Sequence, residues 1–348
     1  MTRLAEEPDI LELAKKLGVA GDGDPVDGIL DLCNRRIDRW IEEAGGVRTV
    51  GHLESVVTAR LQMVFEEVRE DADFDRIKQV YAVGKRDFVF ATMRHKFDDQ
   101  VNPTFGALVR RKTADPDAPD RYVAVIDCRG DKLARRFFTR WHEIAHRLTT
   151  DADPDKPQYR SEHDPIEQLM DRIASHIGFY EPFFGPVFDQ ELRGGARLSF
   201  EVVEAVRRQH FADASFQSTL FACHRRLTTP VVYVEAEERN KAEAEREIKR
   251  GVQWLFEEAA PVAQLRVALV LPNAAAQKSK LFIAPNMRIP SSSVIHRLFL
   301  DDLGLDDAGQ ENLNTWEHSR GKRLADQEVW IEAKKTKGRV VAIVQPVG

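Results

Sequence analysis

The sequence predicts an α+β protein, and three features of its hydrophobic pattern predict this class. Apolar residues recur at helical spacing over residues 9–70, and short β-branched or aromatic runs follow between residues 87 and 126. Helical spacing then returns over 133–148 and 165–177. This order predicts helices packed on a small antiparallel sheet, followed by a helical segment and a C-terminal α/β domain.

Residues 1–75 are expected to form an N-terminal helical region. Its first helix ends at Gly18, and a second covers about 29–41. A third helix is predicted to begin near Val56 and to run on to Val68, because its apolar residues keep a spacing of three to four.

Residues 76–190 are expected to form one core. The runs at 87–91, 105–109 and 122–126 are predicted to be strands of an antiparallel sheet, because they are rich in β-branched and aromatic residues. Turn-rich segments such as 114–120 separate them.

Two helices are predicted to complete this core. The first is opened by Gly130-Asp131 and carries an apolar face of Leu133, Phe137, Trp141, Ala145 and Leu148. A polar loop at 150–163 follows. The second helix runs from Pro165 to about Ile177, with Asp164 as its N-cap and Gly178 as its stop.

The rest of the chain is expected to contain two further parts. Residues 196–232 form a helical segment, in which two short helices are separated by a turn and Ser215 caps the second. Residues 245–348 form the C-terminal α/β domain, preceded by a charged helix or linker over 236–257. In this domain apolar runs lie at 264–271, 281–284, 328–332 and 339–344, with a helix near 292–302.

Composition excludes several classes of protein. The 348 residues hold 51 Lys and Arg against 57 Asp and Glu, so the net charge of −6 indicates neither a nucleic-acid coat nor a membrane-seeking surface. The first residues are acidic and show no signal-peptide pattern, and no apolar run approaches the roughly 20 residues of a membrane span. Three widely spaced cysteines fit a reducing compartment, so we expect the protein in the cytoplasm.

The run His142-Glu143-Ile144-Ala145-His146 predicts a zinc site. Two histidines four residues apart lie on one face of a helix, where both imidazoles can bind one ion. Glu143 lies beside them and can accept a proton from a water whose pKa the metal lowers. The alternative is a surface helix that happens to carry these three residues.

Glu167 is the best candidate for the third ligand, because zinc takes three protein ligands in a catalytic site. The alternative for Glu167 is a capping-box acid, since it falls at the third position after the N-cap Asp164. Asp171, one turn further on, is expected to accept a hydrogen bond from the free ring nitrogen of a ligand histidine. Its alternative is a solvated helix face.

Other residues near this run are weaker candidates. His163 and His176 are candidates for a donor or a rival ligand, although a surface or packed role is favoured for each. The developing oxyanion needs a donor, and the sequence does not choose among Tyr159, Arg172 and Tyr180. The segment 151–162 resembles an EF-hand loop, but its sixth position is Lys rather than Gly, so calcium binding is disfavoured.

Two segments resemble the ImmA/IrrE family of metallopeptidases. They are Phe138-Thr139-Arg140-Trp141-His142-Glu143-Ile144-Ala145-His146 and Glu167-Gln168-Leu169-Met170-Asp171-Arg172-Ile173-Ala174. That family has a Phe-Thr pair before HExxH and a later Glu-x-x-Ala-Asn/Asp-x-Phe-Ala helix. The resemblance covers about residues 75–185. This chain departs from the family at Arg140-Trp141, Ile144-Ala145 and Met170, and in the segment that follows Gly178, which bear on the lining of the cleft more than on metal ligation.

The resemblance implies a zincin-like core, in which the active-site helix packs on a small antiparallel sheet. It implies Zn²⁺ held by His142, His146 and Glu167, with Glu143 as catalytic base. It also implies cleavage of a helix-turn-helix transcriptional repressor in a response to stress or to a mobile element. Some relatives carry a GAF-like sensor at the C-terminus; the alternative for 245–348 is a structural or partner-binding domain.

The segment 196–232 is similar to a helix-turn-helix-like segment of the same family. Its arginines, Arg207, Arg208, Arg225 and Arg226, are candidates for weak phosphate contacts with DNA. A helical bundle that packs on the peptidase is the favoured alternative. The leading hypothesis is therefore a regulatory zinc endopeptidase; the alternative is a transcriptional or ligand-sensing regulator with a vestigial peptidase site.

Overall fold

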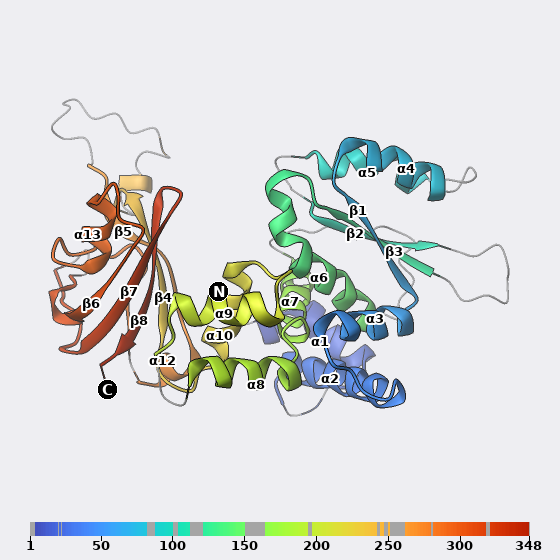
Figure 1. The fold of residues 1–348 in the computed structure, drawn as a ribbon, viewed down its shortest axis with the longest axis horizontal. Coiled ribbons are helices and arrows are strands. Elements are labelled where there is room, and N and C mark those ends of the chain that lie inside the picture. Colours follow the sequence, from blue (N-terminus) through green and yellow to red (C-terminus); the bar gives the residue numbers. More distant parts are fainter. Residues whose placement is uncertain are drawn as a thin grey trace. The chain divides into compact units, whose positions relative to one another are not determined.

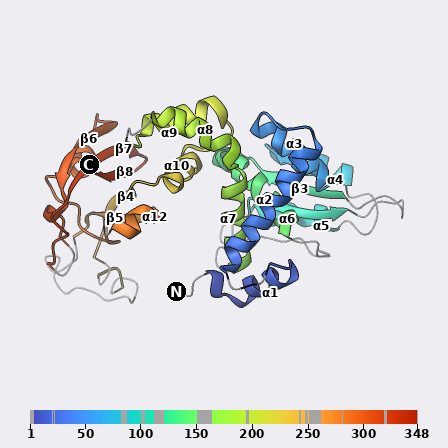
Figure 2. The same cartoon turned by 90° about the horizontal axis from the view of Figure 1, so that it is seen from below.

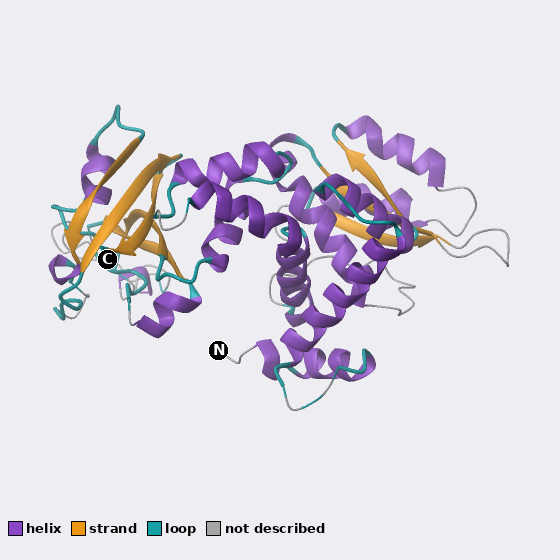
Figure 3. Cartoon of the chain, turned by 60° about the horizontal axis from the view of Figure 1, so that its bottom comes forward, coloured by secondary structure: helices purple, strands orange, loops and turns teal. Residues whose placement is uncertain are grey.

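The computed structural model describes two compact units of mixed α+β structure (Figures 1 and 3). The first unit comprises Met1–Glu191 and Glu204–Ala222, and the second comprises Leu192–Val203 and Cys223–Gly348. The described residues are 4–19, 21, 23–81, 88–99, 104–111, 121–149, 164–193, 197–241, 244–246, 250, 262–279, 281–317 and 321–347.

The first unit is mainly helical around one small sheet. Its helices and strands, in chain order, are η1 Leu4–Glu6, α1 Pro8–Lys16, α2 Pro25–Glu43, α3 Val50–Arg60, β1 Met63–Val68, α4 Asp71–Tyr81, α5 Phe88–Phe97, β2 Gly106–Arg111, β3 Arg121–Asp127, η2 Gly130–Arg135, α6 Arg136–Thr149, α7 Pro165–Ile177 and α8 Glu181–Leu192. Helices α9 Phe200–His210 and α10 Phe216–Arg226 follow in the chain, and each of them is divided between the first and the second unit.

The sheet of this unit has the order β1-β3-β2. Strands β2 and β3 pair antiparallel, as predicted, but β1 pairs with β3 in parallel. The prediction of a purely antiparallel sheet was therefore wrong. After α4 and α5 the chain enters the sheet as β2, which runs opposite to β1, and β3 then runs back in the same direction as β1 and pairs with it.

Two segments of this unit differ from their predicted structure. Residues 63–68, predicted as the end of a helix, form β1, because the backbone of Gln62 takes a φ of 54° and ends the helical run. The segment 87–91 was predicted as a strand, but Phe88–Phe97 is helix α5. Phe90, Met93 and Phe97 are buried at a spacing of three and four, which gives this helix a single core face.

The sheet lies between two layers of helices (Figure 1). One face packs on α4 and α5, where Val123 and Val125 join a cluster with Phe74 and Phe97. The other face packs on α6, which contacts β2 and β3. Leu133 lies in η2 and is 51% exposed, so it is not part of the helix face where it was predicted.

Helix α2 packs against both α6 and α7, and Figure 2 shows it running beside α7. Arg36 Nη1 donates to the carbonyl of Leu148 at 2.5 Å, in the last turn of α6. Asn34 Nδ2 lies 2.9 Å from His176 Nε2 on α7, and the hydroxyl of Tyr180, just after α7, donates to Asp38. The two helices of the predicted site are thus fixed by one long helix.

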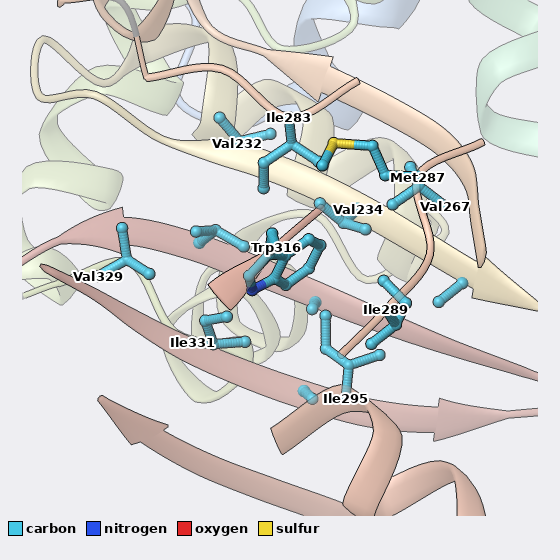
Figure 4. Close-up of a cluster of buried hydrophobic side chains, with 14 of the residues drawn as sticks. Val232, Val234, Val267, Ile283, Met287, Ile289, Ile295, Trp316, Val329 and Ile331 are labelled. Atoms are coloured by element: carbon cyan, nitrogen blue, oxygen red, sulfur yellow. The ribbon is translucent and has the colours of Figure 1, made fainter. Parts of the chain in front are cut away.

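The second unit is built on a five-stranded antiparallel sheet of order β5-β4-β8-β7-β6. Its helices and strands are β4 Val232–Arg239, β5 Gln264–Pro272, α12 Ala274–Ser279, α13 Val294–Leu300, β6 Asp306–Asn312, η4 Leu313–Thr315, β7 Glu328–Thr336 and β8 Arg339–Pro346. Helix α13 packs against β6, β7 and β8. Figure 4 shows Trp316 in the middle of the core, near Val234 and Ile331.

Most predicted apolar runs of the second unit are strands, with three differences. Residues 236–239 belong to β4 rather than to a charged helix or linker, and 251–257 lie outside the described residues. The run 281–284 is not a strand. Strand β6, Asp306–Asn312, was missed because its sequence is polar. Among the described helices, none combines the length and apolarity needed to cross a bilayer.

Candidate metal centre

Helix α6 carries the HExxH run, and all five residues of this run are buried. Its apolar side is set by Trp141, Ala145 and Leu148, each 0% exposed, as the sequence pattern predicts for this face. His142 and His146 lie one turn apart on another side of the helix and are also buried, at 5% and 4% exposed. Their Nε2 atoms are 3.1 Å apart, so both imidazoles point at the same place.

Helix α7 brings Glu167 to the two histidines. The helix spans Pro165–Ile177 as predicted, because Asp164 accepts a hydrogen bond from the Ile166 N–H at 2.8 Å and Pro165 occupies the first helical position. Glu167 Oε2 lies 3.1 Å from His142 Nε2, and Oε1 lies 3.4 Å from His146 Nε2. Its carboxylate faces the histidines, where a ligand would be, rather than the N-cap, where a capping-box acid would be.

Asp171 fixes the ring of His142. Its Oδ1 lies 2.8 Å from His142 Nδ1, which is the contact expected from its position one turn after Glu167. A carboxylate accepts only, so the proton is on Nδ1 and the lone pair of a neutral His142 is on Nε2. That lone pair faces a carboxylate oxygen of Glu167 and the Nε2 of His146. Three side chains of metal-ligating types therefore converge on one place.

The spacing of these atoms fits one small metal ion. His142 Nε2 lies 3.1 Å from His146 Nε2 and 3.1 Å from Glu167 Oε2, while the other oxygen of that carboxylate, Oε1, lies 3.4 Å from His146 Nε2. Ligand atoms about 2.0–2.1 Å from a tetrahedral zinc ion are themselves about 3.3 Å apart. In the described part of the chain these residues form a buried group that could hold a metal ion.

The electrostatics of the group favour a positive charge among its ligand atoms. Burial lowers the pKa of His142, but its contacts with Asp171 and Glu167 outweigh burial and raise it to about 9. Burial raises the pKa of Glu167, but the two histidines hold it well below its usual range. Without a metal, therefore, these contacts favour the protonated form of His142.

Glu143 lies at the mouth of the same pocket, against strand β2. A Cβ atom built on Gly106 would stand 2.4 Å from Glu143 Oε1 and 2.7 Å from Thr139 Cγ2. Only a glycine therefore allows the strand to approach the carboxylate so closely. The pocket has an empty volume of about 300 Å³, part of it open solvent, and is lined by Phe105, Gly106, Phe138, Thr139, His142, Glu143, His146 and Glu167.

The predicted oxyanion donors that can be placed do not line this pocket. Tyr180 donates to Asp38, and Arg172 lies 3.5 Å from Asp27. His176 pairs with Asn34, so it is a packed histidine rather than a rival ligand. Tyr159, His163 and the EF-hand-like segment 151–162 lie outside the described residues.

The predicted DNA-contacting arginines are in part already paired. Glu204 binds Arg207 at 2.8 Å and Arg208 at 2.6 Å, and these contacts lower the pKa of Glu204 to about 2, although burial opposes them. Ser215 does cap α10, because its Oγ accepts a hydrogen bond from the Ser218 N–H at 3.1 Å. Contact with DNA stays a prediction, and these ion pairs weigh against it.

Two lining residues were missed in the sequence. Phe105 and Gly106 were predicted only as part of a strand, yet they form one wall of the pocket. A glycine inside a strand pattern often marks a close approach of another group, so Gly106 carried a usable signal. Phe138 and Thr139 also line the pocket, and they are the Phe-Thr pair on which the family resemblance partly depends.

Comparison of the chain with models of known protein families found no match, and no curated protein sequence matched it either. What the pocket can do therefore follows from its own side chains.

Proposed function

We propose that this protein is a zinc-dependent endopeptidase. The observation that carries the proposal is the convergence of His142 Nε2, His146 Nε2 and a Glu167 carboxylate within 3.1–3.4 Å of one another in a pocket that also contains Glu143. Three such ligands leave one tetrahedral position for a water molecule or a substrate.

Zinc is the metal that this donor set favours. Two neutral imidazoles and one carboxylate form the ligand set of zinc peptidases, whereas calcium and magnesium take oxygen ligands. The contact between Asp171 and His142 adds the supporting carboxylate that is usual behind a zinc-binding histidine. When bound, zinc would polarise a peptide carbonyl and lower the pKa of a coordinated water toward about 7.

Glu143 performs the proton transfers in this mechanism. Its carboxylate, 4% exposed and beside the ligand histidines, takes a proton from the attacking water. It then delivers that proton to the amide nitrogen that leaves when the peptide bond breaks. Gly106 keeps the carboxylate at the mouth of the pocket, because any side chain there would displace it.

Strand β2 offers a way to hold an extended peptide. It pairs with β3 along one edge, and no strand of the described residues pairs with its other edge. An extended substrate can add to such an edge through backbone hydrogen bonds. Since Gly106 begins this strand and lines the pocket, a peptide along β2 would cross the site beside Glu143.

The resemblance stated above suggests the substrate. We propose that it is a helix-turn-helix transcriptional repressor, and that its cleavage in the cytoplasm switches on genes during a stress or mobile-element response. The second unit would then carry the partner-binding or sensing role. The complete set of ligands and base argues against a vestigial peptidase site.

The decisive experiment uses Glu143→Gln and His146→Ala. Each variant and the wild type is loaded with zinc, analysed for metal, and incubated with the product of a neighbouring helix-turn-helix gene and with a degenerate peptide pool. We expect wild-type cleavage that a chelator stops. E143Q should keep zinc and lose cleavage, whereas H146A should lose both. Zinc-independent cleavage, or full activity in E143Q, would contradict the proposal.

A further inference from the structure

Arg135 lies beside one of the residues that line the pocket. Arg135 ends η2, just before α6, and its side chain is exposed. Its Cζ lies 4.3 Å from the centroid of the Phe105 ring, and Phe105 lines the pocket. In the part of the chain that the structure describes, no carboxylate forms an ion pair with Arg135. Its charge is therefore available at the site.

The neighbouring cation, Lys132, already has hydrogen-bond partners within the protein. Lys132 lies 5.9 Å from the centroid of the same Phe105 ring. Its ammonium, however, donates to Asp127 at 2.6 Å and to the carbonyl of Phe97 at 3.0 Å. Lys132 therefore holds the base of η2 in place, and Arg135 is the cation that can meet a ligand.

The stacking on Phe105 prepares Arg135 for a carboxylate. A guanidinium that lies over an aromatic ring keeps its N–H donors in its own plane, and these donors match the two oxygens of a carboxylate. Because the ring already restrains the side chain, less conformational freedom is lost when the ligand binds. The position is adjacent to Gly106, where a peptide added to β2 would pass Glu143.

We infer that Arg135 selects substrates with an aspartate or glutamate close to the cleaved bond, on the side that lies over Phe105. This inference rests on the proposed peptidase function and names a substrate class for the same site. An exposed ion pair contributes roughly 0.2–1 kcal/mol, so the preference over the matching amide should be about 1.5- to 5-fold. Reversal of the charge at residue 135 should reverse the preference.

The test compares three nonapeptide pools. They share the same random neutral positions, but one contains Asp and Glu, the second Asn and Gln, and the third Lys and Arg in their place. Newly formed amino termini give the rate of cleavage. Wild type should cleave the acidic pool fastest, Arg135→Ala should lose the difference between the acidic and amide pools, and Arg135→Glu should prefer the basic pool.

Arg48→Glu provides the matched control. Arg48 is an exposed arginine between α2 and α3 and is not among the residues that line the pocket, so this variant makes the same change in net charge. It should keep the wild-type preference. An R48E variant that changes preference as R135E does would show that only the overall charge matters, and it would overturn the inference.

A binding experiment tests this inference independently of the proposed peptidase function. Fluorescein-labelled forms of the three pools are titrated into zinc-loaded E143Q and into the double variant E143Q/R135E. Tighter binding of the acidic pool to E143Q, lost in the double variant, supports the inference, whether or not the wild type cleaves any pool. Absence of cleavage by the wild type would contradict only the peptidase proposal. Equal binding of all three pools, or no binding, overturns the inference, whatever the cleavage result.

Discussion

Under the proposed function, replacing Gly106 with alanine should nearly abolish cleavage and leave the metal ligands in place. The new Cβ would stand 2.4 Å from Glu143 Oε1, whereas ordinary contacts are 3.4 Å or longer, so the carboxylate must move by about 1 Å. A displacement of about 1 Å at a catalytic group costs roughly 100-fold in rate, equivalent to about 2.7 kcal/mol of transition-state stabilisation. The crowding should also cost about 1–3 kcal/mol of folding stability.

The assay for G106A combines three measurements: cleavage of the degenerate peptide pool, zinc content, and urea unfolding. Gly51→Ala is the control, because a Cβ on this glycine of α3 meets nothing within 4 Å, and alanine favours a helix. We expect G106A to bind one zinc and to cleave at about one hundredth of the wild-type rate, and G51A to match or exceed the wild type in stability. Full activity in G106A would refute the role given to the contact between β2 and Glu143.

Three further predictions concern the metal, acid stability and the thiols. Asp171→Asn should weaken zinc binding about 10- to 100-fold in competition with a chelator, because it weakens the hydrogen bond to His142; unchanged affinity would contradict this role. Asp127→Asn should lower the free energy of unfolding at pH 7 by about 1.5–3 kcal/mol, measured in urea. Burial raises the pKa of Asp127, but bonds from its two cationic partners lower it more. Its contribution is therefore fully present above the unfolded-state pKa of about 3.9 and is lost as pH falls through the lower folded-state pKa, below which the two proteins should converge. Burial raises the pKa of Cys33 to about 12 and that of Cys128 to about 11, so both thiols should resist alkylation at pH 8 in the native protein and react on unfolding, as mass spectrometry would show.

Local signals in the sequence were enough to place the helices of the site. Asp164 and Pro165 specify the start of α7 by their own chemistry, whatever the helix packs against. The i, i+4 spacing of His142 and His146 requires only that α6 be helical. The inference that Glu167 and Asp171 face these histidines came from zinc's need for a third ligand and was supported by the family resemblance, because nothing local indicates which way two helices turn toward each other.

The errors occur where tertiary contacts decide the structure. Residues 63–68 continue a helical spacing, and only the left-handed backbone of Gln62 and the pairing with β3 make them a strand. Phe88–Phe97 looks strand-like in composition but packs one helical face into the cluster around Phe74. The role of Gly106 was not predicted for the same reason, since it depends on a close approach to the carboxylate of Glu143, 37 positions later in the chain.

The contacts of helix α2 limit how far the part of this chain that carries the candidate metal centre can be trimmed. A fragment that begins at residue 76 would keep every ligand and the base, yet it would lack Arg36, which binds the end of α6, and Asn34, which binds α7. It would also lose β1 and so expose one edge of β3. The smallest fragment worth expressing therefore begins at or before Asp24, the residue that caps α2.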